Sequence, residues 1–454
     1  MRPIFYFLFG LLLPILIGCA ESQNADASDD FSLPKLKERT FQFFWQTADS
    51  QYFQIPDRYP TRPFSSVAAT GFGLSSYLVG VENGYITRKE AATRVEATLH
   101  ALWNMRQGPE PSGVSGYRGF FYHFLTMDHA QRFKEVELST IDTGLLMAGV
   151  LSVQSYFDQD NEQEQAIRAL ADSLYLRVEW DWAMQEDGYM SMGWHPEKGF
   201  IPARWKGYNE AMVLLLMALG SPTHPIADSS WAMWCKTYEW EDFYEPHLNF
   251  APLFGHQYSH MFVDFRGIQD AYMREKGSDY FQNSRLATLA NQDYAIRNPA
   301  GFTGYSHLQW GLSACDGPGH GTKAMIGGRE VNFTGYMARG VSAQEIRDDG
   351  TLTPTAVGGS IPFLPDTCIQ TLAYMWNTHH DQLVGEFGFK DAFNLSFPGQ
   401  WFDFEYLGID QGPILIMAEN HDSELIWNLM KKNPYLVNGL RKAGFTGGWL
   451  QERN

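Results

Sequence analysis

Hydrophobic positions along this chain fall into two kinds of helical pattern. In the first kind, apolar residues recur at i, i+3, i+4 and i+7 or at part of that series, which is typical of a helix that buries one stripe. Five segments have this spacing: Phe41, Phe44, Trp45 and Ala48; Ala92, Val95 and Leu99; Ile167, Leu170, Ala171 and Leu174; Trp231, Trp234, Cys235 and Tyr238; and Ile369, Leu372, Ala373 and Trp376. In the second kind nearly every position is apolar or small, as in residues 66–81, 140–156, 209–219, about 257–275, 308–314 and 411–420. A helix that is apolar all round is buried on all sides, so these segments are expected to be inner helices.

The two kinds of helix mostly alternate, as expected when an inner ring of helices is wrapped by an outer ring. Roughly 420 residues shared among six helix pairs leave about 70 residues per pair, enough for two ordinary helices and long loops. The pattern therefore predicts an all-α fold, an (α/α)6 barrel. The fifth inner segment is poorly defined, which leaves a solenoid of helical repeats as an alternative. No repeated sequence signature supports that solenoid.

The first residues differ in character from the rest of the chain. Arg2 is followed by an apolar run from Ile4 to Ile17, and Gly18 and Cys19 come next. This stretch resembles a bacterial lipoprotein signal peptide, because the run is short for a membrane span and a small residue precedes the cysteine. We expect a signal peptide over residues 1–18, an acidic tether over residues 19–31 behind a lipidated Cys19, and a single catalytic domain over residues 32–454. Lipidation would anchor the protein to a bacterial outer membrane, at the cell surface or facing the periplasm.

Composition narrows the classes of partner. The chain has 34 basic and 52 acidic residues, a net charge of -18, which would repel a phosphate backbone and argues against nucleic acid. Aromatic residues make up 15% of the chain, and aromatic rings pack against the C–H faces of neutral sugars. With Cys19 lipidated, the other three cysteines have no metal-like spacing, so neither a metal site nor a disulfide framework is expected from them.

Two carboxylates stand at the starts of strongly apolar segments. Asp142 lies in STIDTGLLMAGVL and Glu210 in GYNEAMVLLLMALG. Acids at such positions also serve simply as N-caps or dipole partners of a helix. However, burial raises the pKa of a carboxyl whereas a helix N-terminus lowers it, so two such acids can be held in different protonation states. General acid and base catalysis requires that difference, and paired carboxylates suggest glycoside hydrolysis.

Polar and aromatic side chains cluster in the connections before the inner helices, where long loops on a rigid scaffold usually build a site. The candidates for substrate binding are Trp194, His195, Arg204, Tyr208, Asn209, His256, Tyr258, His260, Arg266 and Trp310. His256 and His260 are four residues apart, with Asp264 one turn further on, which is a spacing that can bind a metal. The zinc-protease glutamate is missing, and sugar binding or core packing explains these histidines more simply. We therefore expect no metal and no cofactor.

Eight blocks of the sequence carry a family resemblance. TGFGLSSYLVGVENGYITRKEA, ELSTIDTGLLMAGVL, VEWDW, GYNEAM, SPTHP, WGLSACDGP, DGTLTPTA and LGIDQGPILIMAEN occur in this order between about Leu36 and Trp449. They resemble the bacterial glucoamylase-like domain family, which includes glycoside hydrolase family 144. The resemblance implies an (α/α)6 barrel and endo-acting hydrolysis of β-1,2-glucan to short sophoro-oligosaccharides.

The resemblance also implies roles for individual residues. Glu210, the Glu of GYNEAM, is the expected general acid, and Asp142 is the first choice for the base. Glu137, Asp316 and Asp410 also lie in matching blocks and are further candidates for the base. The chain departs from the family in two places: many relatives have Glu where Asp142 stands, and KAMIGGREVNFTGYMARGVSAQEIRDD before the DGTLTPTA block is similar to an insertion. The second difference would affect linkage or chain-length preference.

Three functions are therefore carried forward. The first is hydrolysis of β-1,2-glucan by a monomeric enzyme whose partner is an oligo- or polysaccharide. The second is transglycosylation, or hydrolysis of another β-glucoside linkage, at the same acids. The third is a non-catalytic surface lipoprotein that binds glycan, which the presence of both Glu210 and Asp142 disfavours.

Overall fold

The computed structural model describes Met1 and residues 29–451. Residues 31–454 form one compact unit, and residues 1–30 are assigned to another. The expected signal peptide, the lipidation site Cys19 and most of the expected tether lie outside the described residues. Within the described part of the chain, none of the helices is both long enough and apolar enough to cross a membrane.

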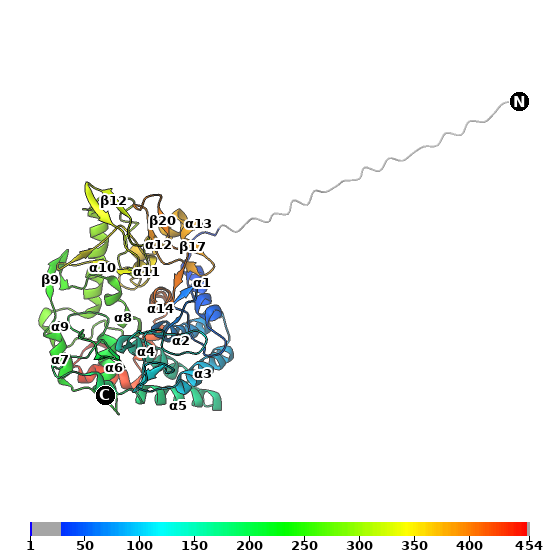
Figure 1. Cartoon of the computed structure of the whole chain (residues 1–454), viewed down its shortest axis with the longest axis vertical. Coiled ribbons are helices and arrows are strands. Elements are labelled where there is room, and N and C mark those ends of the chain that lie inside the picture. The colour runs from blue at the N-terminus through cyan, green and yellow to red at the C-terminus, as the bar shows by residue number, and fades with distance from the viewer. Residues whose placement is uncertain (2–28, 452–454) are drawn as a thin grey trace. The chain divides into compact units, whose positions relative to one another are not determined.

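Six buried helices occupy the interior of residues 31–454: α2 (Val67–Glu82), α4 (Thr140–Tyr156), α6 (Met212–Gly220), α8 (Tyr258–Phe262), α11 (Pro354–Gly358) and α14 (Gly408–Asp422). Helices α2, α4, α6, α8 and α14 contact one another in a closed circuit, and α11 contacts α14. The Gln257 side chain donates a 2.8 Å hydrogen bond to the Ala356 carbonyl, which connects the start of α8 to α11. In Figure 1, α2, α4, α8 and α14 lie inside the unit, with α3, α5, α7 and α9 around them.

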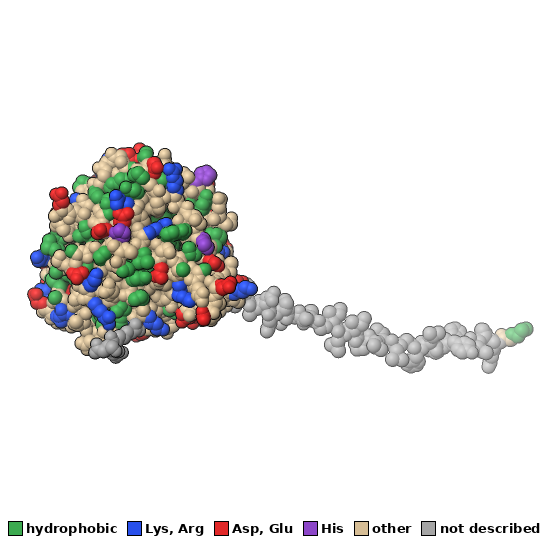
Figure 2. Space-filling model, turned by 90° about the horizontal axis from the view of Figure 1, so that it is seen from below, with side chains coloured by type: hydrophobic (Ala, Val, Ile, Leu, Met, Phe, Trp, Pro, Cys, Tyr) green, Lys and Arg blue, Asp and Glu red, His purple; other side chains and the backbone are tan. Residues whose placement is uncertain are grey.

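Amphipathic helices surround this interior. They are α1 (Leu33–Thr47), α3 (Arg88–Asn104), α5 (Glu162–Leu176), α7 (Ser229–Cys235), α9 (Ala271–Lys276), α10 (Tyr280–Arg297), α12 (Pro365–Thr378), α13 (His380–Leu383), α15 (Leu425–Met430) and α16 (Pro434–Lys442). Helix α1 packs on α14, α5 packs on α4, and the last helix α16 packs on α6. On the face drawn in Figure 2, acidic and basic side chains are interspersed with apolar ones.

The strands are two to four residues long and belong to the connections between helices. They are β1 (Arg58–Tyr59), β2 (Ser65–Ser66), β3 (Gly116–Tyr117), β4 (Phe120–Phe121), β5 (Phe124–Leu125), β6 (Leu138–Ser139), β7 (Gly193–His195), β8 (Gly199–Phe200), β9 (Trp240–Phe243), β10 (Glu245–Leu248), β11 (Ala314–Cys315), β12 (Lys323–Ile326), β13 (Arg329–Asn332), β14 (Met337–Ala338), β15 (Gly340–Val341), β16 (Ile346–Arg347), β17 (Val384–Gly385), β18 (Gly388–Phe389), β19 (Phe393–Asn394), β20 (Trp401–Phe402) and β21 (Tyr406–Leu407). The pairings between the named strands are antiparallel, and β6, β7 and β8 form a three-stranded sheet.

Helices α2 and α4 approach each other closely through glycine. A Cβ atom added at Gly71 would lie 2.6 Å from the Leu145 carbonyl oxygen, and one added at Gly149 would collide with the backbone of Gly71. Only glycine permits this contact, because any larger residue needs the backbones to move apart. The two helices are therefore joined by direct backbone packing.

Helix-rich architecture was predicted correctly, but two inner segments were not. Residues 257–275 were expected to form one helix, whereas the structure has α8, a non-helical stretch and the separate α9. Residues 308–314 are not helical, and Gly311 there has a φ of 130°, which no helix contains. The short helix α11 contacts α14 instead, and its TPTAVGG sequence has a proline at its first turn, where proline is tolerated.

Candidate active site

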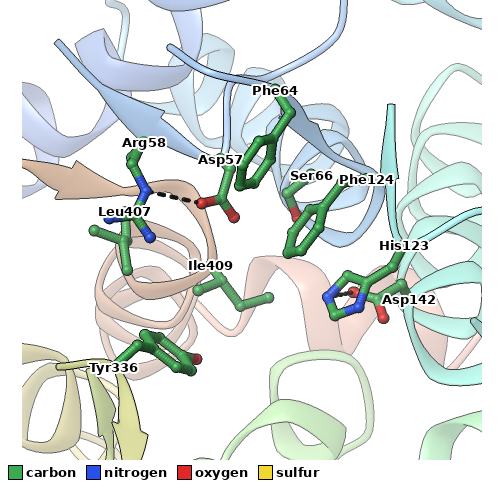
Figure 3. Close-up of a pocket in the computed structure, with 10 residues that line it drawn as sticks. All are labelled: Asp57, Arg58, Phe64, Ser66, His123, Phe124, Asp142, Tyr336, Leu407 and Ile409. Carbon is green, nitrogen blue, oxygen red and sulfur yellow. Dashed lines mark hydrogen bonds and ion pairs between the residues drawn. The ribbon is translucent and has the colours of Figure 1, made fainter. Parts of the chain in front are cut away.

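A cavity of about 270 Å³ lies where three inner helices begin. Its walls come from the connections before α2, α4 and α14 and from one residue of the segment before β14. The lining residues are Asp57, Arg58, Phe64, Ser66, His123, Phe124, Asp142, Tyr336, Leu407 and Ile409. Figure 3 shows these side chains arranged around a common space.

Asp142 lies in the first turn of α4 and is 5% exposed. Ser139 is the N-cap of that helix, and its hydroxyl donates a 2.5 Å hydrogen bond to Asp142 Oδ2. The His123 ring nitrogen Nε2 lies 3.6 Å from Asp142 Oδ1 (Figure 3). Burial raises the pKa of Asp142, although the charge of His123 and the Ser139 hydrogen bond oppose that rise.

His123 connects Asp142 with a second carboxylate. Its Nδ1 atom lies 2.8 Å from Glu137 Oε1. Burial disfavours the charged imidazole, but Asp142 and Glu137 together outweigh it and raise the pKa of His123 to about 9. The pKa of Glu137 is lowered, because the hydrogen bond and charge of His123 exceed the effect of burial. At neutral pH the group therefore contains a cationic histidine between two acids.

Glu210 lies in the turn that leads into α6 and is 9% exposed. The Ser259 hydroxyl donates a 2.9 Å hydrogen bond to its carbonyl oxygen, which ties this turn to the start of α8. Among the described residues, Glu210 Oε2 has no hydrogen-bond partner. Burial, assisted by the negative charge of Asp142, raises the pKa of Glu210 to about 7. Glu210 is not in the cavity lining, but it lies at the start of α6, which packs against the Asp142 helix α4.

Tyr258, at the start of α8, lies within the influence of three acids. Burial raises the pKa of its hydroxyl well above the usual value, and the charges of Asp410, Glu210 and Asp142 raise it further. The starts of α4, α6, α8 and α14 therefore bring these four residues into one electrostatic environment.

Arg58, which lines the cavity beside Asp57, binds a second group of carboxylates. Its Nη1 atom lies 2.7 Å from Asp316 Oδ2 and 3.1 Å from Glu405 Oε2, and its Nε atom lies 3.2 Å from Asp57 Oδ2. Burial raises the pKa of Asp57 to about 6 despite the nearby guanidinium group. Arg58 is thus the cation that holds three acids together.

Three further carboxylates adjoin this group. Asp391, Asp403 and Asp410 are buried, and among the described residues one oxygen of each has no hydrogen-bond partner. Burial and the neighbouring acids raise the pKa values of Asp403 and Asp410 to about 7, and they raise the pKa of Asp391 well above its ordinary value. Oxygens of Asp316, Asp391 and Asp403 lie within 4.8 Å of one another, so this is the place in the described chain whose donors could hold a hard cation.

Several predicted binding residues adjoin the candidate acids. Trp194 and His195 belong to β7, which pairs with β6. Strand β6 contains Ser139, the N-cap of the helix whose first turn holds Asp142. Both side chains are half-buried, and Arg132 Nη2 lies 3.2 Å from His195 Nδ1. Tyr208 and Asn209 precede Glu210 directly, but both are buried.

Arg204 lies in the same connection and is half-buried. Its Nη1 atom donates a 2.6 Å hydrogen bond to the Ile201 carbonyl, and its Nε atom lies 3.7 Å from the exposed Asp187 carboxylate. Its described hydrogen bonds therefore stabilise the connection itself.

The structure corrects the binding role expected for four residues. Trp310, His256 and His260 have no exposed surface, and they bond to Thr371, the Phe250 carbonyl and Ser284 respectively. Arg266 forms ion pairs with Asp264 and Glu424, and Glu424 follows the last turn of α14, whereas Asp410 lies in its first turn. A 15-residue helix spans about 20 Å, which separates Arg266 from the acids.

The same contacts account for the histidine spacing that suggested a metal. His256 and His260 are engaged in the core, and Asp264 is bound by Arg266 and Lys431. Each of the three residues therefore has a structural partner within the fold.

Sequence reasoning missed Asp57, Arg58, His123, Tyr336, Asp391, Asp403 and Glu405. The IPDRYP and FYHF stretches that hold Asp57, Arg58 and His123 interrupt apolar sequence with charge, which was a usable signal. Asp391 and Asp403 had no such signal, because their importance depends on neighbours far away in the chain.

Comparison with known proteins places these residues in a wider context. The sequence model of the Glycoamylase family, described as "Putative glucoamylase", matches residues 202–434. That range includes Glu210 and the α14 acid Asp410, and Asp142 lies before it.

Two solved structures match nearly the whole chain. A "putative glucoamylase" from Bacteroides uniformis is 30% identical, with a TM-score of 0.81 over 92% of this chain and 98% of the other. An endo-β-1,2-glucanase from Chitinophaga pinensis, solved with sophorotriose and glucose, is 28% identical, with a TM-score of 0.80 over 92% of this chain and all of the other.

A longer relative is an exo β-1,2-glucooligosaccharide sophorohydrolase (non-reducing end) from Parabacteroides distasonis. It is 28% identical over 93% of this chain, and the chain spans 60% of that protein's length. The relatives thus include one protein named as endo-acting and one named as exo-acting.

Proposed function

This protein belongs to the Glycoamylase family, and on that premise we propose that it is a glycoside hydrolase. It would cleave internal linkages of β-1,2-glucan and release short sophoro-oligosaccharides. The observation that carries the proposal is the placement of two buried carboxylates, Asp142 and Glu210, at the starts of the neighbouring helices α4 and α6, where the charge of Asp142 adds to the rise in the pKa of Glu210. Two of the relatives, the endo-β-1,2-glucanase and the sophorohydrolase, are named for action on β-1,2-linked glucose.

The architecture proposed with this function is an (α/α)6 barrel. The inner ring would consist of α2, α4, α6, α8, α11 and α14, and their starts would all face the substrate. The closed circuit of contacts among five of these helices and the contact of α11 with α14 support this arrangement. Asp142 and Asp410, in the first turns of α4 and α14, and Glu210, just before α6, would then lie at one end of the barrel.

Glu210 is proposed as the general acid. Its carboxyl, with a pKa of about 7, is largely protonated at mildly acidic pH, so it can donate its proton to the glycosidic oxygen as the bond to C1 breaks. The leaving sugar then departs as a neutral alcohol. Low exposure favours the neutral acid until substrate binds, because burial penalises the carboxylate.

Asp142 is proposed as the base. As a carboxylate it would accept a proton from the water that attacks C1, which makes the hydroxyl of the new sugar end. The cationic His123 at 3.6 Å and the Ser139 hydroxyl favour this ionised form. Asp142 lines the cavity, so water and substrate can reach it.

Asp410 is the second candidate for the base. One of its carboxyl oxygens has no hydrogen-bond partner among the described residues, and its charge influences the same Tyr258 as Glu210 and Asp142 do. Comparison of Asp142→Asn with Asp410→Asn would rank the two. The base variant should lose turnover by several orders of magnitude, whereas a positioning residue should lose less.

The test of the proposed function is incubation of the purified protein with β-1,2, β-1,3, β-1,4 and α-1,4 glucans, followed by product sizing over time. Endo-hydrolysis of β-1,2-glucan gives a mixture of products whose lengths decrease with time, and each cleavage creates one new reducing end. Sophorose as the sole early product would replace the endo assignment with exo-action. Products without new reducing ends would indicate transglycosylation, and unchanged glucan would favour a binding protein.

We also propose that Cys19 carries a lipid anchor and that the domain acts as a monomer at the outer membrane. Lipoprotein-like residues 1–19 support the anchor. Metabolic labelling with a fatty acid should mark the wild type and not Cys19→Ser, and protease treatment of intact cells distinguishes the outer face from the periplasm. Light scattering of the domain tests the monomer.

A further inference from the structure

Tyr336 is a large aromatic side chain exposed inside the candidate active site. It is 53% exposed, and it lines the same cavity as Asp57, His123 and Asp142. It lies between β13 and β14, in the insertion-like segment that precedes the DGTLTPTA block. Figure 3 shows its ring on one side of the cavity and the rings of Phe64 and Phe124 on another.

The backbone on both sides of Tyr336 is fixed. The Thr334 amide donates a 3.1 Å hydrogen bond to Asp349 Oδ2, and Arg339 Nη2 donates a 3.1 Å hydrogen bond to the Gly335 carbonyl. On the other side, Met337 pairs with Cys315 in the β11–β14 ladder. A surface tyrosine on a mobile loop would not have these restraints, so the position of this ring is built into the fold.

The guanidinium group of Arg339 also connects the Tyr336 turn to the carboxylates around Arg58. Arg339 is fully buried and forms two hydrogen bonds, of 2.7 and 2.9 Å, with the Asp349 carboxylate. Its Nη1 atom also donates to the carbonyl oxygens of Cys315, at 2.9 Å, and Asp316, at 3.3 Å. Arg339 therefore sets the distance between the turn that carries Tyr336 and Asp316, one of the three carboxylates that Arg58 binds.

The Tyr336 hydroxyl is suited to binding and not to proton transfer at neutral pH. Burial among surrounding residues raises its pKa well above the usual value, and the charges of Asp410, Asp391 and Asp57 raise it further. The ring is exposed and yet closely surrounded by protein, which is the situation of a side chain that faces a cavity. It thus offers a flat apolar face and a neutral hydroxyl to a ligand.

We propose that Tyr336 is a specificity-determining residue that stacks on one glucose unit of the glucan and holds the chain across the acids. The proposal rests on the proposed function and deepens it. Aromatic rings pack on the C–H face of a pyranose, and the phenol hydroxyl can bond to a sugar hydroxyl. Because the ring stands in the insertion-like segment and not on the helices that carry the acids, its presence would affect chain-length preference without changing the acids.

Tyr336→Ala and Tyr336→Phe provide the test, with Tyr374→Ala as the matched control. Tyr374 is 37% exposed on α12 and has no part in the proposed site. Each variant is compared with the wild type for KM, kcat, product lengths on β-1,2-glucan and Tm. In a Glu210→Gln background, calorimetry measures the affinity for sophoro-oligosaccharides of increasing length.

The expected result for Tyr336→Ala is a KM and a dissociation constant raised about tenfold or more, the usual scale for loss of an aromatic anchor. The kcat should change by less than about threefold and the product lengths should shift, while Tm stays constant. Tyr336→Phe should retain most of the affinity, because it keeps the stacking face. Tyr374→Ala should match the wild type throughout.

Unchanged affinity and unchanged product lengths in Tyr336→Ala would overturn the proposal. A loss of activity that follows a lower Tm would also overturn it, because it would indicate a structural role. Failure of the wild type on β-1,2-glucan would instead contradict the proposed function, and the variants would then be compared on the glucan that the wild type cleaves. A wild type that cleaves and binds no glucan would overturn both.

Discussion

Ser139 and Asp142 bond to each other in both directions. The Ser139 hydroxyl donates to Asp142 Oδ2 at 2.5 Å, and it accepts a 3.2 Å hydrogen bond from the Asp142 backbone amide. One hydroxyl therefore caps helix α4 and also stabilises the ionised form of the proposed base. Helix start and site chemistry depend on the same atom.

Ser139→Ala should affect both properties. Loss of an N-cap costs about 1 kcal/mol of the free energy of unfolding, measured by urea denaturation. Loss of the hydrogen bond should also raise the pKa of Asp142, so the acidic limb of the pH–rate profile should move to higher pH. Thr87→Ala is the control, since Thr87 caps α3 in a capping box away from the cavity. It should cost similar stability and leave the pH profile unchanged; a shift in both variants would exclude the specific role of Ser139.

Glu210→Gln should reduce kcat by a factor of about 10³ or more while folding is retained, because the amide keeps the shape of the side chain but delivers no proton. In the wild type, activity should fall as pH rises through about 7, because that is where the acid loses its proton. Turnover measured from pH 4 to 9 checks both statements. Wild-type kcat in the variant would remove Glu210 from the mechanism.

The same substitution should stabilise the protein in a pH-dependent way. The folded pKa of about 7 lies above the ordinary value of 4.5, so below that ordinary value both states are protonated and ionisation has no effect. As pH rises from about 4 to 7, the unfolded state loses its proton first, which lowers wild-type stability. At pH 8 the free energy of unfolding of Glu210→Gln should therefore rise by about 3 kcal/mol relative to the wild type. Urea denaturation at pH 4, 6 and 8 measures the trend, and a constant difference would contradict it.

Arg339 and Asp349 form a buried ion pair, and removal of one partner alone should lower the free energy of unfolding. Arg339→Met should lower the free energy of unfolding by about 3–5 kcal/mol, because it leaves the Asp349 carboxylate buried without its cation. The double variant Arg339→Met, Asp349→Asn should lose less than the sum of the single losses. Arg347→Met is the control, because the Arg347–Glu345 pair is exposed and should contribute less than about 1 kcal/mol. Additive losses would mean that the pair is not coupled.

Replacement by alanine should reduce the free energy of unfolding by different amounts at Trp194 and Trp310. Trp310 has no exposed surface, so Trp310→Ala should cost about 3–5 kcal/mol of stability. Trp194 is half-buried beside the strand that caps Asp142, so Trp194→Ala should cost less. Urea denaturation ranks the two, and equal losses would show that Trp194 is as much a core residue as Trp310.

Local pattern was sufficient where a helix carries its own signal. The uniformly apolar stretch of α4 predicted both the helix and a carboxylate at its start, and Asp142 lies there. It failed for α11, five residues long, because so short a helix has no periodicity to detect and is held by neighbouring helices. It also assigned Trp310 to a cleft, since residue type alone does not distinguish a sugar-binding ring from a core ring.

The carboxylates around Arg58 were harder to predict. Asp57 and Glu405 are separated by more than 340 residues, and the pairing of β1 with β21 and the packing of α2 against α14 bring their connections together. Asp316 alone of these acids was a candidate, because it belongs to a block with a family resemblance. A cluster of charged residues that are far apart in the sequence can be identified only when the fold is known.

The backbone contact between Gly71 and Gly149 determines which changes this site tolerates. Because α2 and α4 touch through main-chain atoms, the spacing of the connections at their starts does not depend on the size of the other side chains between them. Substitutions elsewhere on the two helices can accumulate over a long divergence while Ser66 and Asp142 keep their separation. One methyl group at either glycine would widen that separation at once.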